Sequence, residues 1–389
     1  MGLRQLTDKI KPTFSKGGKL GFLHSTFDAF ESFLFVPNTV THKGSHVRDC
    51  NDLKRVMIMV VIALVPAFLF GIYNIGYQHN LAFGGEMSFG AMVWYGFLKI
   101  LPLYLVSYIV GLGIEFISAQ IQGHEVNEGY LVSGMLIPLI VPVDVPLWML
   151  AIAVAFAVII GKEVFGGTGM NIWNPALLAR AFLFFSYPSK MSGDYVWVAG
   201  LSNGGAVDGF SGATPMVHAQ ANGLEGLNQA GTSLCDLVCG LIPGAVGETS
   251  VIAILIGAII LIWTGVASWK IMLSSVIGAL AVGFLCNALA TDATPYLQMP
   301  AYYHLLLGGF AFGTVFMATD PVTSAQTETG KWIYGFLIGA LTVVVRLFNP
   351  GYMEGMMLAI LLMNTFAPLI DHYVISSSLK RRAKKVKIA

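Results

Sequence analysis

Long apolar runs, separated by short polar segments, make up most of this chain. Ten runs approach the roughly twenty residues that a helix needs to cross a membrane. Five precede a long polar segment, at residues 56–74, 93–119, 130–145, 147–166 and 173–188, and five follow it, at residues 250–267, 270–291, 303–319, 332–348 and 353–372. The pattern therefore predicts an all-α polytopic membrane protein with about ten transmembrane helices.

The composition supports this class. Hydrophobic residues make up 56% of the 389 residues and charged residues only 11%, whereas about a quarter of an ordinary soluble domain is charged. The net charge of +1 carries little information as a total, so the distribution of charge matters more. We expect no nucleic-acid partner.

The basic residues predict the orientation of the chain. Nine Lys or Arg residues lie in residues 1–55 and six in the tail after Asp371, but only Lys190 lies in residues 188–249. Basic segments stay in the cytoplasm. We therefore expect both termini in the cytoplasm and the long polar loop outside, as an even number of spans requires.

These features divide the chain into five regions, listed here in order. They are a cytoplasmic N-terminal arm (1–55), a first membrane repeat (56–188), an outer loop (189–249), a second membrane repeat (250–372) and a basic cytoplasmic tail (373–389). The two membrane regions show a weak internal similarity at a nearly constant offset. Gly161-Lys162 corresponds to Gly330-Lys331, and Asn174-Pro175 to Asn349-Pro350. A repeat of five spans has opposite orientations in its two copies, which is the inverted repeat of many transporters.

Two of the predicted spans contain helix breakers. The third holds Pro138 and Pro142, and the eighth ends at Asp320-Pro321. Irregular backbone at membrane depth is tolerated only where protein or a cavity satisfies its polar groups. We therefore expect broken or half-length helices here, and a functional centre between the two repeats.

The four cysteines are too few and too scattered for a disulfide framework. Cys235 and Cys239 are four residues apart, so a helix would place them one turn apart, too distant for a relaxed disulfide. We expect free thiols and no metal site.

Thr214 is the candidate for a covalent modification in the outer loop. It ends the stretch D-G-F-S-G-A-T at residues 208–214, directly after the small residues Gly212 and Ala213. Small residues leave the backbone open, so the hydroxyl is expected to be exposed and approachable. Spacing alone is equally typical of a small-residue turn that ends at Pro215.

The same stretch resembles the flavinylation motif of a known family. The family comprises the B subunits of sodium-pumping NADH:quinone oxidoreductases and the related D subunits of Rnf-type ferredoxin:NAD oxidoreductases. The resemblance extends from about Val36 to Asp371 and implies that Thr214 is joined to FMN through a phosphoester made by a dedicated flavin transferase. The matching motif positions besides Thr214 are Asp208, Gly209, Ser211, Gly212 and Ala213.

A second candidate site follows the fourth predicted span. Gly166-Gly167-Thr168-Gly169 lacks the Lys-Ser/Thr of a phosphate-binding loop, so the residues alone favour a helix break capped by asparagine. By the resemblance, Asn171 and Asn174, together with Ser133 on the short third span, border a non-covalent riboflavin.

Three carboxylates are candidates for function. Glu115 lies late in a predicted span, where a carboxylate is costly and often functional, although solvation near the cytoplasmic interface is the alternative. By the resemblance, Gly111, Gly113 and Glu115 mark the quinone region. Asp320 and Asp371, at the cytoplasmic ends of the eighth and tenth spans, offer oxygen ligands to sodium, but a structural role at a helix end is favoured.

The resemblance implies a flavin-carrying subunit of a redox-driven sodium pump in the bacterial inner membrane. Such a subunit passes electrons from a partner flavoprotein to ubiquinone and depends on an NADH-oxidising flavoprotein and a second FMN-carrying subunit. An Rnf-type D subunit and a passive channel or small-solute transporter are the alternatives. The long N-terminal arm and the Glu125-Val126-Asn127-Glu128-Gly129 loop favour the sodium pump, and a channel has no reason to carry the Thr214 motif.

Overall fold

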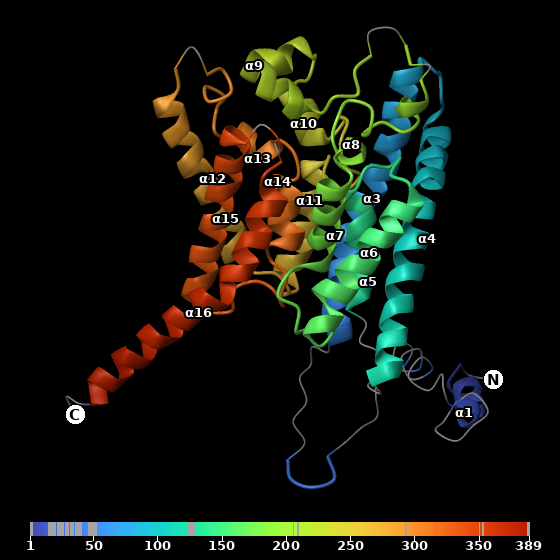
Figure 1. Ribbon diagram of the computed structural model, residues 1–389, viewed down its shortest axis with the longest axis vertical. Coiled ribbons are helices and arrows are strands. Elements are labelled where there is room, and N and C mark those ends of the chain that lie inside the picture. The colour runs from blue at the N-terminus through green and yellow to red at the C-terminus, as the bar shows by residue number, and fades with distance from the viewer. Residues whose placement is uncertain are drawn as a thin grey trace.

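A computed structural model shows a helical bundle (Figure 1). It describes residues 3–14, 21, 27, 31, 35, 41–45, 53–122, 129–204, 206–207, 210–291, 294–349, 351 and 354–386. No strand occurs within these residues. The predicted all-helical class is therefore confirmed for the described part of the chain.

Six helices in the described residues are long and apolar enough to cross a membrane. They are α3 (Leu53–Phe83), α4 (Phe89–Gln122), α6 (Leu147–Gly161) extended by the 3-10 turn η2 (Glu163–Phe165), α12 (Trp269–Leu289), α15 (Glu328–Phe348) and α16 (Met356–Val386). Three shorter apolar helices accompany them, namely α5 (Tyr130–Ile140), α7 (Pro175–Ser186) and α11 (Val251–Trp263). These nine helices overlap nine of the ten apolar runs seen in the sequence.

The remaining run, the eighth (residues 303–319), is broken in the structure. It divides into α13 (Tyr303–Leu306), α14 (Phe310–Phe312) and a π-helical turn, η4 (Gly313–Met317). Gly308, between α13 and α14, has a φ of +59°, a left-handed conformation that favours glycine. α5 is short as well, with only 11 residues and Pro138 inside it. The eighth predicted span is therefore broken and the third is half-length, as the breakers indicate.

Arg346 of α15 satisfies the backbone that the break exposes. Its side chain is fully buried and donates hydrogen bonds to the carbonyl oxygens of His304 at 2.5 Å and Leu307 at 2.9 Å. A third bond reaches the carbonyl oxygen of Glu354 at 3.0 Å. Irregular backbone inside a membrane needs internal partners of this kind.

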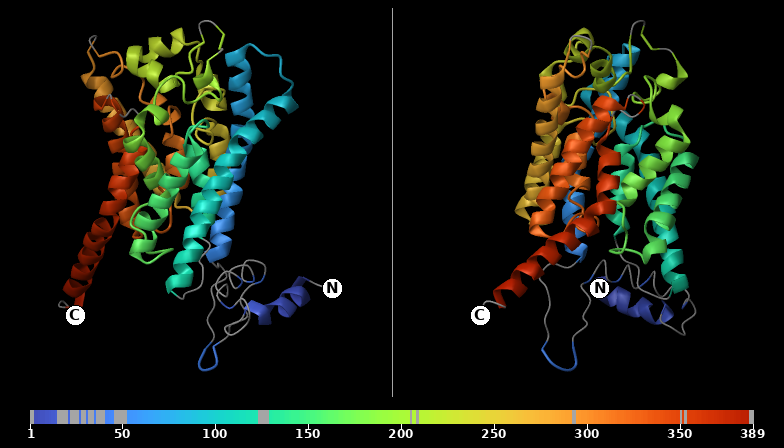
Figure 2. Two further views of the ribbon diagram at one scale, coloured as in Figure 1. Left: turned by 45° about the vertical axis from the view of Figure 1, so that its right-hand side comes forward. Right: turned by 60° about the vertical axis from the view of Figure 1, so that its left-hand side comes forward.

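The two halves of the chain lie side by side. In Figure 1, α3 to α7 occupy one side of the bundle, and α12, α15 and α16 the other. Small residues allow close approach within the second half: a Cβ atom at Gly339 would lie 1.9 Å from the carbonyl oxygen of Ser275 on α12. The described part of the outer loop includes α8 (Pro188–Met191), α9 (Pro215–Gln229) and α10 (Leu234–Cys239). These helices lie at one end of the bundle, and α16 projects from the other (Figures 1 and 2).

α16 extends beyond the apolar run from which it was predicted. The helix continues past residue 372 to Val386, so most of the segment 373–389 is helical. The residues after Pro368 include no further proline and no glycine, and many are good helix formers. Hydropathy marks where the apolar run ends, whereas helical propensity decides where the helix ends.

Candidate functional site

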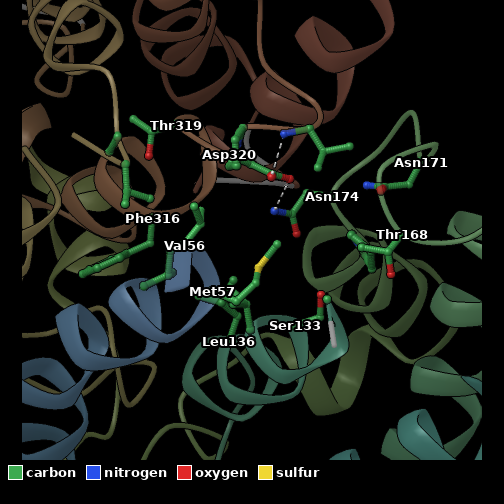
Figure 3. Close-up of a pocket in the computed structure, with 18 of the residues that line it drawn as sticks. Val56, Met57, Ser133, Leu136, Thr168, Asn171, Asn174, Phe316, Thr319 and Asp320 are labelled. Atoms are coloured by element: carbon green, nitrogen blue, oxygen red, sulfur yellow. Dashed lines mark hydrogen bonds between the residues drawn. The ribbon is translucent and has the colours of Figure 1, made fainter. Parts of the chain in front are cut away.

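The first candidate site is a pocket near the start of α3, shown in Figure 3. We call it the asparagine pocket. Its polar lining includes Ser133 of α5, Asn171, Asn174 and Asp320. The structure thus brings together three predicted riboflavin contacts and one predicted sodium residue.

Asn174 has two roles in this pocket. Its side-chain oxygen accepts hydrogen bonds from the backbone N–H groups of Ala176 at 3.0 Å and Leu177 at 3.4 Å, which caps α7. Its side-chain nitrogen donates to Asp320 Oδ2 at 3.3 Å. The predicted capping role is confirmed, and the same amide joins the two halves of the bundle.

Asp320 is held by further hydrogen bonds from its own turn. Its carboxylate accepts from the backbone N–H of Val322 at 3.1 Å and from Thr323 Oγ1 at 3.0 Å. Asp320 therefore stabilises the turn that follows the broken segment and also lines the asparagine pocket.

The chemistry of the asparagine pocket suits a polar aromatic ring system. The hydroxyl of Ser133 and the amides of Asn171 and Asn174 offer both donors and acceptors. Apolar side chains form other walls, among them Met57, Leu136 and Phe316 (Figure 3). Apolar walls with a few convergent polar groups are typical of small-molecule sites. These apolar residues have no motif, so sequence reasoning missed them.

The second candidate site surrounds Thr214 at the opposite end of the bundle. We call it the Thr214 pocket. Thr214 is the N-cap residue of α9, yet its side chain makes no capping hydrogen bond. Thr214 is half-buried and is part of the pocket lining. Its hydroxyl is therefore not used by the helix that Thr214 begins.

The two small residues before Thr214 are buried, which corrects the expectation of exposed backbone at this end of the motif. Gly212 and Ala213 are buried. A Cβ atom at Gly212 would lie 2.3 Å from the carbonyl oxygen of Asp194, so only glycine fits there. Ser211 is exposed, and its hydroxyl accepts a hydrogen bond from the backbone N–H of Ala213 at 3.3 Å. Asp208 and Gly209 lie outside the described residues.

A cluster of charged side chains, Arg180, Glu248 and Glu354, lines the Thr214 pocket. Arg180 of α7 donates from Nη1 to Glu248 Oε1 at 2.5 Å, and from Nη2 to Glu354. Burial raises the pKa of the Glu248 carboxyl, an effect that the Arg180 guanidinium opposes. Sequence reasoning missed this cluster, although an arginine within an apolar run was a visible signal.

The Thr214 pocket also holds an unpaired polar group. Thr249 is 2% exposed, and its Oγ1 has no hydrogen-bond partner among the described residues. A buried hydroxyl without a partner is costly unless a ligand or water supplies one. With the aromatic rings of Phe184 and Trp197 in the lining, the residues present fit a flavin that carries polar edges and a flat face.

One helix connects the two pockets. Asn174 caps α7 in the asparagine pocket, and Arg180 of the same helix lies in the Thr214 pocket. At about 1.5 Å rise per residue, the two residues are ~9 Å apart along the helix axis. Different parts of α7 therefore line the two pockets.

Glu115 is buried in an ion pair with Lys162. Both side chains are 4% exposed, so the alternative of a solvated Glu115 is wrong. Glu115 belongs to the face of α4 that packs inside the bundle, which also includes Ser107, Gly111 and Ala119. Sequence reasoning missed Lys162 as its partner, because 47 residues separate the two.

The other predicted quinone residues differ in their surroundings. A Cβ atom at Gly111 would lie 1.9 Å from the ring of Tyr130, whereas a Cβ atom at Gly113 would meet nothing within 4 Å. Gly111 is therefore a packing position, and Gly113 faces open space.

Asp371 lies in α16 and binds Thr327, the N-cap residue of the neighbouring helix α15. Its carboxylate accepts hydrogen bonds from the backbone N–H groups of Gln326 at 2.7 Å and Thr327 at 3.0 Å, and from Thr327 Oγ1 at 2.6 Å. It is not part of the asparagine pocket lining. The structural role favoured by the sequence is the one that these bonds support.

The predicted free thiols are confirmed for the described cysteines. Cys235 and Cys239 of α10 lie with their sulfur atoms 3.8 Å apart and form no disulfide, and Cys286 is also free. Within the described residues, no group of three or more His, Cys, Asp or Glu side chains is arranged to hold a metal ion.

Comparisons with known proteins identify the family of the chain. The model of the NQR2, RnfD, RnfE family matches residues 40–380. The chain therefore belongs to this family of integral membrane proteins.

Individual relatives are more specific. The chain is 46% identical over 408 residues to the B subunit of the Na(+)-translocating NADH-quinone reductase of Chromohalobacter salexigens, covering 99% of this chain and 97% of the relative. It is 45% identical over 405 residues to the B subunits of the same reductase from Pseudomonas aeruginosa and Azotobacter vinelandii, covering 98% of this chain and 99% of each relative. The family resemblance seen in the sequence is thereby confirmed.

Proposed function

We propose that this chain is the flavin-carrying membrane subunit of a sodium-pumping NADH:quinone oxidoreductase. It passes electrons from a partner flavoprotein through covalent FMN and riboflavin to ubiquinone. The observation that carries the proposal is the hydroxyl of Thr214. It lies in a matching flavinylation motif, makes no capping bond and lines a pocket with an unpaired hydroxyl.

In the Thr214 pocket, Thr214 Oγ1 is the attachment point for the FMN phosphate. The Thr249 hydroxyl is available for a hydrogen bond to the flavin, whereas Arg180 already pairs with Glu248 and Glu354. The rings of Phe184 and Trp197 offer flat apolar surface. The flavin supplies the redox chemistry when bound, and the chain supplies its attachment, orientation and electrostatic surroundings.

In the asparagine pocket, Ser133, Asn171 and Asn174 would hold a non-covalent riboflavin through hydroxyl and amide contacts. Because α7 forms a wall of both pockets, the two flavins would lie on one helix and within one rigid scaffold. The proposed electron path therefore needs no large movement between them.

The chain requires partners for the complete reaction. We propose an NADH-oxidising flavoprotein, a second FMN-carrying subunit and ubiquinone as partners, and a flavin transferase that loads Thr214. Gly111, Gly113 and Glu115 remain the proposed quinone region. Asp320, which lines a cavity, is the better sodium candidate than Asp371, whose oxygens accept hydrogen bonds from Gln326 and Thr327.

The proposed topology places ten spans, as two inverted repeats, in the bacterial inner membrane with both termini in the cytoplasm. The basic residues of the terminal segments support it. The arrangement in Figure 2 agrees, because α9 and α10 lie at the end of the bundle opposite the projecting end of α16. The alternative of an Rnf-type D subunit is less well supported, because the relatives described above are B subunits over nearly the full length.

The test is covalent flavin content in cells that also make the transferase. The full chain and its Thr214→Ala and Ser211→Ala variants are denatured, separated on a gel and examined under ultraviolet light. We expect fluorescence in the wild type and in Ser211→Ala, and none in Thr214→Ala. Fluorescence that persists in Thr214→Ala would show that the flavin is attached elsewhere.

A further inference from the structure

A groove outside both candidate sites lies between α15 and α16. Thr329 and Ile333 of α15 form one wall, and Ile370, Val374, Ser377 and Arg381 of α16 are part of the other. It lies near the end of the bundle from which α16 projects at an oblique angle (Figures 1 and 2). We call it the α15–α16 groove.

The helical spacing puts each set of side chains on one face. The α16 residues are 4, 3 and 4 positions apart along the chain, and the two α15 residues are four apart. The carboxylate of Asp371 holds the helices together here, because it accepts hydrogen bonds from the N–H groups that precede α15. The groove is therefore a fixed feature of the packing of the two helices.

The surroundings indicate that the groove lies at the membrane boundary. Trp269 and Trp332, at the starts of α12 and α15, pack edge to face with ring centroids 5.9 Å apart. Beside them, Lys270 and Lys331 pair with Glu328. Tryptophan and lysine together are typical of the interface between hydrocarbon and water.

The groove changes in chemical character along its length. Ile333, Ile370 and Val374 present apolar surface, and the side chains that follow on α16 are hydroxyls and a guanidinium. A neighbouring hollow shares Ser377 and Arg381 and adds Lys380 and Lys384. An apolar wall that leads to hydroxyl and basic groups matches an acyl chain joined to a phosphate.

The C-terminal segment that contributes to the groove is basic. Residues 372–389 contain six Lys or Arg residues and no Asp or Glu. Ile375 and Leu379, on the same stretch, are 50% and 58% exposed. Basic residues combined with exposed apolar ones favour an anionic membrane surface over water.

We propose that the α15–α16 groove binds one anionic phospholipid, with its phosphate at Ser377 and Arg381 and an acyl chain along Ile333 and Val374. The inference does not rest on the proposed electron-transfer function. It assigns the extension of α16 the role of a lipid-binding element beside the helix pair that Asp371 joins.

The test is native mass spectrometry of the purified full chain, alone and with its proposed partner subunits. Delipidated protein is titrated with dioleoyl-phosphatidylglycerol or dioleoyl-phosphatidylcholine. The variant Arg381→Gln removes the groove cation. The matched control is Arg382→Gln, which removes the same charge one residue away, at an exposed position that is not part of the groove lining.

We expect the wild type to retain phosphatidylglycerol in preference to phosphatidylcholine, and inorganic phosphate not to displace it. Arg381→Gln should weaken phosphatidylglycerol binding about fivefold, as expected for one basic group at an anionic surface, and Arg382→Gln should change it less than twofold. Equal losses in both variants would mean non-specific attraction and would overturn the proposal. So would equal retention of the two lipids, displacement by inorganic phosphate, or loss of a partner subunit in Arg381→Gln without loss of lipid.

Discussion

Gly111 and Gly113 belong to the same prediction, because both lie in α4 and both are assigned to the quinone region. The perturbation is Gly→Ala at each position. At Gly111 the added methyl group would lie 1.9 Å from Tyr130 Cζ and 2.3 Å from its hydroxyl oxygen. At Gly113 it would meet nothing within 4 Å.

The expected effects on stability have opposite signs. Alanine is favoured over glycine in a helix by about 0.5–1 kcal/mol, so Gly113→Ala should be neutral or slightly stabilising. At Gly111 the fully buried ring of Tyr130 must move, which costs about 1–3 kcal/mol as overpacking. Its hydrogen bond to the carbonyl oxygen of Ser107, at 3.0 Å, is worth about 1 kcal/mol more. The two variants should therefore differ by about 2–4 kcal/mol.

The assay is unfolding of the purified chain in mixed micelles of a mild detergent and SDS, followed by tryptophan fluorescence. Tyr130→Ala provides the second test. Once the ring is removed, Gly111→Ala should cost little further, because the two residues are in contact and their effects are not additive. Equal stability of the two single variants, or additive losses in the double variant, would refute this account of α4. Measured in parallel, the KM for a soluble quinone should change in Gly113→Ala if that position borders the quinone.

Three further predictions follow from the contacts of the candidate residues. Lys162→Met should destabilise the chain by about 3–5 kcal/mol, because it leaves Glu115 buried and unpaired, and adding Glu115→Leu should restore most of the loss. If Lys162→Met unfolds like the wild type, the ion pair is not important for stability. Asn174→Ser should keep the cap of α7 but lose the amide that reaches Asp320, so the riboflavin content should fall while the stability of the chain is retained. Unchanged riboflavin content would mean that Asn174 serves only as a cap. Asp320→Asn should raise the sodium concentration for half-maximal quinone reduction, whereas Asp371→Asn should lower protein yield and leave that concentration unchanged. Unaltered sodium dependence in Asp320→Asn would exclude the proposed role of Asp320 in the sodium path.

The sequence by itself predicted those features that depend on neighbouring residues. Hydropathy over about twenty residues predicted the apolar helices, because burial in lipid is read from composition alone. Pro138 and the end of the broken segment at Asp320-Pro321 marked the irregular helices, and Asn174-Pro175 marked a helix start. Capping and helix breaking involve residues within one or two turns, so a local pattern is sufficient to indicate them.

Only the tertiary structure determined which of these residues meet. Arg180, Glu248 and Glu354 are far apart in the chain but form one buried charge cluster beside Thr214. Glu115 and Lys162 pair across 47 residues, and Asp371 binds Thr327, the N-cap residue of α15, across 44 residues. The pairing of buried charges and the shape of a pocket depend on how helices pack, and no local pattern of hydrophobic and polar residues records that packing.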